Sequence, residues 1–160
     1  MASNLQKYFS PGRVNMIGEH IDYNGGYVFP CAISLGTFAQ VANRADTKTC
    51  LYSMNLPEIG IAGVIAQGGH KAAHGFDIVI YGTLPVGAGL SSSASIELLT
   101  AVILNTEFTF GLAQIGLVKL SQRAENEFVG MNCGITFAVG MGSSARQVGE
   151  KSLPAHQRRI

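Results

Sequence analysis

Apolar residues recur at every second position in three stretches of the chain. Phe76, Ile78 and Ile80 are apolar residues at alternate positions, separated by residues that can face the other way. This alternation predicts a strand with one face on the core. The stretches Thr37 to Ala42 and Lys48 to Tyr52 show a weaker form of the same pattern, and we expect strands there as well,.

Two later stretches have the pattern of helices. Residues Ser92 to Asn105 are apolar on most sides, which predicts a helix buried within the core,. From Ala113 to Phe128 apolar residues recur every three or four positions, which predicts an amphipathic helix,. Strands and helices together in a chain of this length predict one α+β domain.

The C-terminal stretch has a different character. From Gly142 to Ile160 the sequence is polar and basic, contains glycine and proline, and has neither a helical nor a strand period. We therefore expect a folded domain over residues 1–141 and a disordered basic tail over residues 142–160. Such a tail could bind an acidic partner, but a solvated tail without a function is the simpler interpretation.

Composition narrows the class of protein. Of the 160 residues, 47% are hydrophobic and 13% are charged, which argues against disorder throughout the chain,. The net charge of +1 gives no electrostatic reason to expect nucleic acid,. No apolar run is long enough to span a bilayer, and the first residues do not resemble a signal peptide,. Three widely spaced cysteines suit reduced thiols, so we expect a cytoplasmic protein with no membrane partner,.

Glycines and serines gather between the last predicted strand and the first predicted helix. In this glycine-serine loop (residues 84–93) the glycines allow a bulky anion to approach the backbone, and the helix N-terminus offers unpaired N–H groups to it,. Serine hydroxyls can add hydrogen bonds or bind Mg²⁺. An ordinary loop in which Ser91 or Ser92 caps the helix fits the same residues, so both interpretations stay open.

Two further segments carry polar groups that suit binding. Between Pro11 and Gly26 charged side chains lie among apolar residues and glycines, a set that can bind sugar hydroxyls,. A hairpin-like turn at residues 24–25 with solvated charges nearby is the alternative. Near the end of the second helix, Glu125 could complete a magnesium site with a serine hydroxyl, or it could be an exposed helical glutamate,.

Together and in this order, the three segments resemble galactokinases, which belong to a superfamily of galactose, homoserine, mevalonate and phosphomevalonate kinases. The resemblance covers most of residues 8–141. Residues 89–94 match the superfamily's ATP loop, and residues 19–26 resemble the galactokinase signature. Ile21 stands where galactokinases usually have threonine. N-acetylgalactosamine kinases can have isoleucine at this position, but residues 24–27 favour galactokinase.

The resemblance implies a fold and a role for each matched residue. The fold is the superfamily's N-terminal domain, which is ribosomal protein S5 domain 2-like. Arg13 would stabilise charge on the transferred phosphoryl group, Ser53 would touch the nucleotide, and Ser93 and Glu125 would hold Mg²⁺. The residues that would bind galactose are Glu19, His20, Ile21, Asp22 and Gly134. The residues that would cradle the phosphates of ATP are Gly87, Ala88, Gly89, Leu90, Ser91, Ser92 and Ser93.

The chain also departs from the galactokinase pattern. The family reads Cys-Gly-Ile-Met-Asp-Gln-Phe-Ala where this chain reads Cys-Gly-Ile-Thr-Phe-Ala around Thr136, so the catalytic aspartate is absent. A family segment with aromatic residues near the adenine is missing between Leu56 and Gly63, as is the helix that usually precedes Pro11. After Gly142 the family continues into a second domain, which the basic tail replaces.

These departures lead to three expectations about function. The first is a galactokinase fragment, truncated and inactive, whose family reaction converts ATP and galactose into galactose 1-phosphate. The second is a sensor without catalysis that binds galactose and ATP and signals to a protein partner. The third is a gene remnant without a function.

Overall fold

The computed structural model describes residues 5–18, 21, 24, 26–53, 74–85, 87–130, 134 and 141–149. Within this part of the chain the fold consists of one sheet and two α-helices. In chain order the elements are β1 (Gln6–Asn15), β2 (Pro30–Asn43), β3 (Cys50–Ser53), β4 (Phe76–Gly82), α2 (Ser92–Glu107), α3 (Gln114–Ala124), the π-helix η2 (Glu125–Val129) and β5 (Arg146–Gln147). None of these helices is long and apolar enough to cross a membrane.

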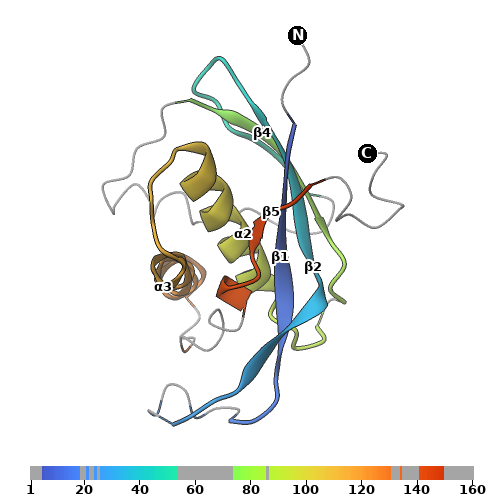
Figure 1. The fold of residues 1–160 in the computed structure, drawn as a ribbon, viewed down its shortest axis with the longest axis vertical. Helices are drawn as coiled ribbons and strands as arrows, with labels where there is room; N and C mark the ends of the chain where they lie inside the picture. The colour runs from blue at the N-terminus through green and yellow to red at the C-terminus, as the bar shows by residue number, and fades with distance from the viewer. Residues whose placement is uncertain are drawn as a thin grey trace.

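The five strands form one mixed sheet in the order β3-β4-β2-β1-β5 (Figure 1). Every neighbouring pair is antiparallel except β3 and β4, which run parallel. The register brings Tyr8, Ala39 and Ile80 into one row across β1, β2 and β4. All three are buried, so this row belongs to the face of the sheet that packs on the helices.

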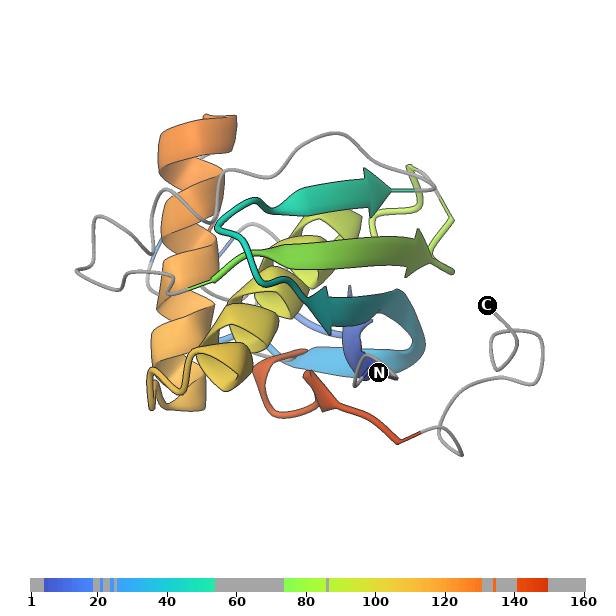
Figure 2. The same cartoon turned by 90° about the horizontal axis from the view of Figure 1, so that it is seen from above.

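Both α-helices lie on the same side of the sheet (Figure 2). α2 packs directly on β1 and β2, and α3 packs on the side of α2 that faces away from the sheet (Figure 2). Six consecutive residues of α2, from Ala94 to Leu99, are buried, and six consecutive positions cover every side of a helix,. The prediction of a buried helix is therefore confirmed.

The predicted strands and helices are confirmed with changed ends. The strand expected at Thr37 to Ala42 is the C-terminal half of β2, and the second helix is α-helical only as far as Ala124, where the wider turn of η2 takes over. β1 carries no pattern that predicts it, because Pro11 and Gly12 interrupt its alternation,. It forms a strand because β2 supplies its hydrogen bonds, with a shift of register between Pro11 and Arg13.

The tail predicted to begin at Gly142 differs from the structure. Arg146 and Gln147 form β5, which pairs with Tyr8 and Phe9 at the edge of the sheet. Ala145 is buried beside it. A strand of two residues uses backbone hydrogen bonds that need no side-chain period, so the sequence pattern could not reveal it. Residues 150–160 lie outside the described part, and a disordered tail there stays a prediction.

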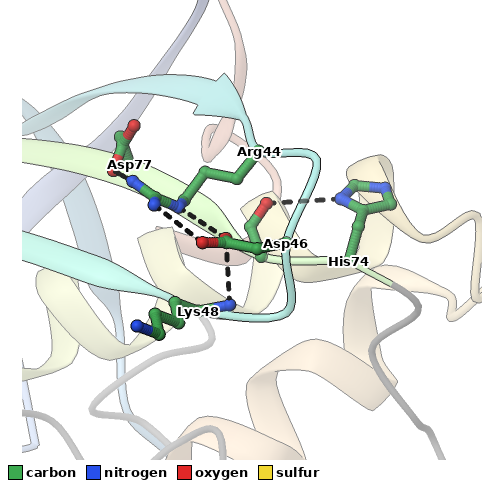
Figure 3. A network of polar contacts seen from close by, with 6 residues as sticks. Arg44, Asp46, Lys48, His74 and Asp77 are labelled. Carbon is green, nitrogen blue, oxygen red and sulfur yellow. Dashed lines mark hydrogen bonds and ion pairs between the residues drawn. The ribbon is translucent and has the colours of Figure 1, made fainter.

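A polar network closes the turn between β2 and β3 (Figure 3). Arg44 donates to both carboxylate oxygens of Asp46, at 2.7 and 2.9 Å, and to Asp77 Oδ1 at 2.7 Å. The guanidinium lowers the pKa of Asp46 to about 2,. Because Asp77 belongs to β4, the network ties this turn to the neighbouring strand.

One buried hydroxyl links β1 to the far end of α2. The Tyr8 hydroxyl, which is fully buried, donates to Glu107 Oε1 at 2.5 Å. Burial, and then the Glu107 carboxylate, raise the pKa of Tyr8 far above its usual value,. The phenol therefore stays protonated and acts as a donor at every ordinary pH.

We expect Tyr8→Phe to lower the free energy of unfolding by about 1.5–3 kcal/mol, because it removes a hydrogen bond to a charged group inside the protein. Tyr27→Phe is the matched control, since the Tyr27 side chain is 97% exposed, and it should change stability by less than about 0.5 kcal/mol,. Urea denaturation of the three proteins measures both values. Equal stability of Tyr8→Phe and the unsubstituted chain would contradict the role given to the Tyr8 hydroxyl.

Candidate functional site

The glycine-serine loop has an irregular backbone that faces open space. Gly87 and Gly89 have φ of 74° and 68°, in the region that favours glycine,. Within the described part of the chain, no atom lies within 4 Å of the point where a Cβ would stand on either residue. The two glycines therefore permit the left-handed backbone of the loop, and the space beside them is open within the described part of the chain.

The N-terminus of α2 is open at the end of this loop. Ser91 occupies the capping position, but its backbone is left-handed (φ 57°, ψ 53°) and its side chain makes no capping hydrogen bond. An ordinary cap has an extended backbone and accepts a hydrogen bond from the first turn, so Ser91 is not an ordinary cap. The first turn also contains no acidic residue. Uncapped N–H groups at a helix start suit an anion.

β1 runs directly beside the loop. The Arg13 N–H donates to the carbonyl oxygen of Leu90 at 3.1 Å. A Cβ on the preceding residue, Gly12, would lie 2.9 Å from the same oxygen and 2.5 Å from Leu84 Cδ2, so only glycine permits this close approach. Arg13 and the glycine-serine loop, far apart in the sequence, are therefore neighbours in the fold.

The helices bring Ser93 and Glu125 together. Ser93 Oγ lies 3.3 Å from Glu125 Oε1 and donates to it. Glu125 is only 2% exposed, so the interpretation of an exposed helical glutamate is wrong. Ser93 itself is exposed in the first turn of α2, so the pair links the buried Glu125 to the exposed surface beside the glycine-serine loop. Glu125 is also the first residue of the π-helix η2, and wide turns of this kind are frequent at functional sites,.

A second buried carboxyl lies beside Glu125. Glu97 follows Ser93 by one turn of α2 and is also 2% exposed. Burial, and then the hydrogen bond to and the charge of Glu125, raise the pKa of Glu97 to about 10,. Neither Glu97 Oε2 nor Glu125 Oε2 receives an N–H or O–H from another group in the described part of the chain. Glu97 therefore keeps its proton at neutral pH,.

Buried hydroxyls tie the first turn of α2 to the sheet. Ser95 Oγ donates to the carbonyl oxygen of Ser10 at 2.8 Å and lies 2.9 Å from Thr37 Oγ1. All three residues are at most 1% exposed. Because Ser10 is in β1 and Thr37 is in β2, this hydroxyl cluster holds the helix start against both strands.

The segment with the sugar-binding pattern connects β1 to β2. The Met16 N–H donates to the Phe29 carbonyl oxygen at 3.0 Å, and the Phe29 N–H donates to the Ile17 carbonyl oxygen at 2.9 Å. The ends of the segment therefore pair as the two arms of a hairpin, whereas the turn expected at residues 24–25 includes Gly25, which lies outside the described residues. A hairpin connection can still carry a binding site, so the hydrogen bonds do not decide between the two interpretations.

Of the five residues matched to the sugar site, four are in this connection and the fifth, Gly134, comes much later in the sequence. Ile21 is 39% exposed. Glu19, His20 and Asp22 lie outside the described residues. Gly134 is half-buried between two stretches that are not described. The proposed sugar contacts therefore stay predictions.

Ser53 ends β3 at the same end of the sheet as the glycine-serine loop. It pairs with Ile80 in the parallel β3–β4 ladder, and β4 continues from Ile80 to Gly82 before the loop begins. The backbone of Ser53 thus lies toward the loop end of the sheet, and its contact with a nucleotide stays a prediction.

Two groups at this site were not among the predicted site residues. Glu97 is the one charged residue within the apolar helix pattern, and that isolation is a signal that sequence reasoning could have used. The hydroxyl cluster of Ser10, Thr37 and Ser95 has no such signal, because its three members are scattered in the sequence and common in any loop or strand.

Family comparisons cover most of the chain. The model described as "Galactokinase galactose-binding signature" matches residues 3–43, and the model described as "GHMP kinases N terminal domain" matches residues 58–143. The second match spans more than half of the chain. Between them the two matches include the β1–β2 connection, the glycine-serine loop and Glu125.

Curated galactokinases are similar along nearly the whole chain. The galactokinase of Lactiplantibacillus plantarum is 48% identical over 166 residues, covering 88% of this chain and 43% of that protein, and that of Bacillus subtilis is 49% identical, covering 86% and 42%. The chain thus spans less than half the length of these relatives. The match to the Lactiplantibacillus plantarum galactokinase spans 166 aligned positions but uses only 88% of the 160 residues of this chain. That relative therefore has residues inside the matched region that this chain lacks.

Solved structures share the fold. Lactococcus lactis galactokinase, solved in complex with galactose, has a TM-score of 0.79 and 34% identity, covering 91% of this chain and 47% of that one. The mevalonate kinase of Methanococcus jannaschii has a TM-score of 0.70 at 19% identity, covering 94% and 57%. The expected superfamily fold is therefore confirmed, with galactokinase as a neighbour in both sequence and structure.

The raised pKa of Glu97 predicts a pH dependence of stability. Between the ordinary pKa of 4.5 and the raised value of about 10, the folded protein keeps a proton that the unfolded chain releases. Rising pH therefore favours the unfolded chain, by at most about 1.4 kcal/mol per pH unit. We expect Glu97→Gln to remove this dependence, measured by urea denaturation at several values between about pH 5.5 and 8.

Glu127→Gln is the matched control for this experiment. Glu127 is an exposed glutamate that pairs with Arg123 at 2.7 Å, so its replacement removes a carboxylate without touching the buried pair. It should keep the pH dependence of the unsubstituted chain. Parallel stability curves for Glu97→Gln and the unsubstituted chain would mean that Glu97 is ionised in the folded protein.

Proposed function

Because the chain belongs to the GHMP kinases and to their galactokinase branch, we propose that it forms the galactose- and ATP-binding part of a galactokinase. The observation that carries the proposal is the hydrogen bond from Ser93 to Glu125, which lies beside the glycine-serine loop at the uncapped N-terminus of α2. A polyphosphate beside a divalent cation needs these same elements, which are backbone N–H groups, a hydroxyl and a carboxylate.

The phosphates of ATP would lie on the glycine-serine loop. Residues 87–93 supply N–H groups and serine hydroxyls, and the open space beside Gly87 and Gly89 leaves room for the phosphates. The left-handed backbone of Ser91 supports this role, because such strain in a residue other than glycine costs about 1 kcal/mol and is usually retained at functional sites,. Ser53 would contact the nucleotide from the end of β3.

The residues at this site fit Mg²⁺. Ser93 and Glu125 would hold the ion, and the fit is supported by Glu125 Oε2, a buried carboxylate oxygen with no N–H or O–H donor among the described residues. A bound Mg²⁺ neutralises charge on the phosphates of ATP. The carboxylate and the hydroxyl are oxygen ligands, which is the type that Mg²⁺ prefers.

Galactose would be held by the β1–β2 connection. In the proposed contacts Glu19, His20 and Asp22 accept from and donate to its hydroxyls, with Ile21 and Gly134 at the pocket wall. The support is the match of residues 3–43 to the galactose-binding signature and the galactose bound to the Lactococcus lactis relative. Arg13 would face the transferred phosphoryl group, because its backbone borders the glycine-serine loop.

In the family reaction the 1-hydroxyl oxygen of galactose forms a bond to the γ-phosphorus of ATP. The bond from that phosphorus to the β-phosphate oxygen breaks, ADP leaves, and the hydroxyl proton passes to a base. We propose that this chain performs the step poorly or not at all, because the family's aspartate has no counterpart beside Thr136. Residues 135–140 lie outside the described part, so the support is the sequence itself.

Binding without catalysis makes a sensor the second candidate function. It is favoured by a specific contrast, since the glycine-serine loop and the Ser93–Glu125 pair are intact while the aspartate segment is not. A cytoplasmic location fits either candidate and stays a prediction.

We expect Glu125→Gln to weaken binding of Mg-ADP about tenfold while leaving the affinity for metal-free ADP unchanged, because it removes one charged ligand of the ion. Calorimetric titration with ADP, in the presence of Mg²⁺ or of a chelator, measures both affinities. Glu127→Gln is again the matched control and should behave like the unsubstituted chain. Equal Mg-ADP affinity for all three proteins would rule out Glu125 as a magnesium ligand.

We expect no galactose-dependent release of ADP at ordinary kinase rates, which are about 1–100 s⁻¹, because the sequence lacks the family's aspartate, which would receive the proton of the attacking hydroxyl,. A coupled assay with Mg-ATP, with and without galactose, measures the rate. The Lactococcus lactis galactokinase serves as the positive control. Turnover by this chain within that range would show that the aspartate segment is dispensable.

A further inference from the structure

The side chain of Ser95 joins the start of α2 to two strands of the sheet. Its Oγ donates to the carbonyl oxygen of Ser10 at 2.8 Å and lies 2.9 Å from Thr37 Oγ1. Ser10 and Thr37 stand opposite each other in the β1–β2 ladder. A hydroxyl has one hydrogen, so while that of Ser95 points to Ser10, the Ser95 oxygen accepts from Thr37. The hydroxyl is therefore held by both neighbouring strands at once.

The backbone of Ser95 reaches toward the glycine-serine loop. The Ser95 N–H donates to the carbonyl oxygen of Ser91 at 3.0 Å, which closes the first turn of the helix,. Ser91 is the residue with the left-handed backbone at the uncapped helix start. Ser95 thus connects the end of the loop to a fixed point inside the sheet.

A second contact holds the other end of the same segment. The Arg13 N–H donates to the carbonyl oxygen of Leu90 at 3.1 Å. Residues 10–13 of β1 are therefore joined to residues 90–95 at both ends, by the Ser95 hydroxyl at one end and by the Arg13 N–H at the other. With two contacts the strand and the helix start have a defined position relative to each other, and with one contact they can pivot.

We propose that Ser95 is a positioning residue, whose hydroxyl holds the N-terminus of α2 and residues 10–13 in the relative position in which both face the phosphates of a nucleotide. The inference rests on the proposed function, because this position matters there only if residues 87–93 and Arg13 bind phosphate. Ser95 is fully buried, so it acts through these neighbours and not by contact with the nucleotide.

A merely structural role for Ser95 makes a different prediction. Removing the hydroxyl takes a donor away from the buried Ser10 carbonyl oxygen, which lowers the free energy of unfolding in either case,. If the hydroxyl only stabilises the fold, the folded variant binds phosphate as tightly as the unsubstituted chain does. Stability therefore cannot distinguish the two roles, but the affinity for phosphate can.

The test compares Ser95→Ala with the unsubstituted chain, below the melting temperature of both. The readout is the ratio of the affinities for ADP and for adenosine, measured by calorimetric titration, because this ratio isolates the phosphates from the rest of the nucleotide. In Ser95→Ala the ratio should fall about fivefold, the size expected for losing one hydrogen bond between neutral groups. The affinity for adenosine should not change.

Ser121→Ala is the matched control. Ser121 is also a fully buried serine in a helix, and its Oγ donates to the carbonyl oxygen of Leu117 at 3.0 Å, within α3. Its replacement removes a buried hydroxyl of the same kind, but one that does not join α2 to the sheet. The ratio should equal that of the unsubstituted chain. A fall as large as that of Ser95→Ala would overturn the positioning role, because any buried hydroxyl would then have the same effect.

A double variant tests whether Ser95 acts through the hydroxyl cluster. Thr37→Val keeps the shape of the side chain and removes its hydroxyl. In the Ser95→Ala background, adding Thr37→Val should leave the ratio where Ser95→Ala alone puts it, because neighbouring residues in one interaction are not additive. A further fall would contradict the proposal. Ser95→Cys replaces Ser95→Ala if the alanine variant does not fold, and the same fall is expected, since the S–H group is a weak donor.

The failures of the two proposals are distinguishable. If the unsubstituted chain binds ADP no more tightly than adenosine, the phosphate site itself is refuted, and the role of Ser95 with it. If the unsubstituted chain prefers ADP and Ser95→Ala keeps that preference in full, Ser95 has no positioning role and the phosphate site stands.

Discussion

The enclosure of α2 between the sheet and α3 is the constraint on which the rest of the structure depends. A helix buried on every side gains stability from its apolar residues, but each polar group it carries must find a partner inside the protein. Ser95 finds its partners in Ser10 and Thr37, and Glu97 finds its partner in Glu125. The contacts of these two buried side chains of α2 therefore join it to other elements, and they fix how the helix sits on its neighbours.

The same constraint explains why the candidate site lies at the N-terminus of α2. Ser93, in the first turn of α2, is exposed, whereas the residues from Ala94 to Leu99 are buried. The N-terminus of α2 therefore lies at the edge of the core, and its uncapped N–H groups face the glycine-serine loop. The hydroxyl cluster and the Arg13 to Leu90 hydrogen bond hold the two sides of this opening against β1. The buried hydrogen bonds of Ser95 hold the first turn of α2 in place, while its N–H groups have no capping side chain. Such a helix start can bind an anion without rearranging its backbone.

The family resemblance and the physical reading agree on one half of the site. On the side proposed for the nucleotide, the loop backbone, Ser93 and the buried Glu125 are described, and Ser93 meets Glu125 beside the glycine-rich helix start. For the sugar side, the support is the sequence signature over residues 3–43, carried on a connection whose ends pair as a hairpin. The family's aspartate is missing from both sides of the site, because the sequence around Thr136 does not contain it.

The sequence by itself determined the elements whose pattern is local. The alternation of Phe76, Ile78 and Ile80 and the apolar density of Ser92 to Asn105 each depend on residues within a few positions of one another, so both could be predicted. It also determined the motifs, because a glycine-rich loop before a helix is a local feature. Only the tertiary structure decided β5, the burial of Glu125 and its pairing with Glu97, since each depends on groups brought together from distant parts of the chain. Backbone pairing and the pKa of a carboxyl group follow from such neighbours, and a sequence pattern does not contain them.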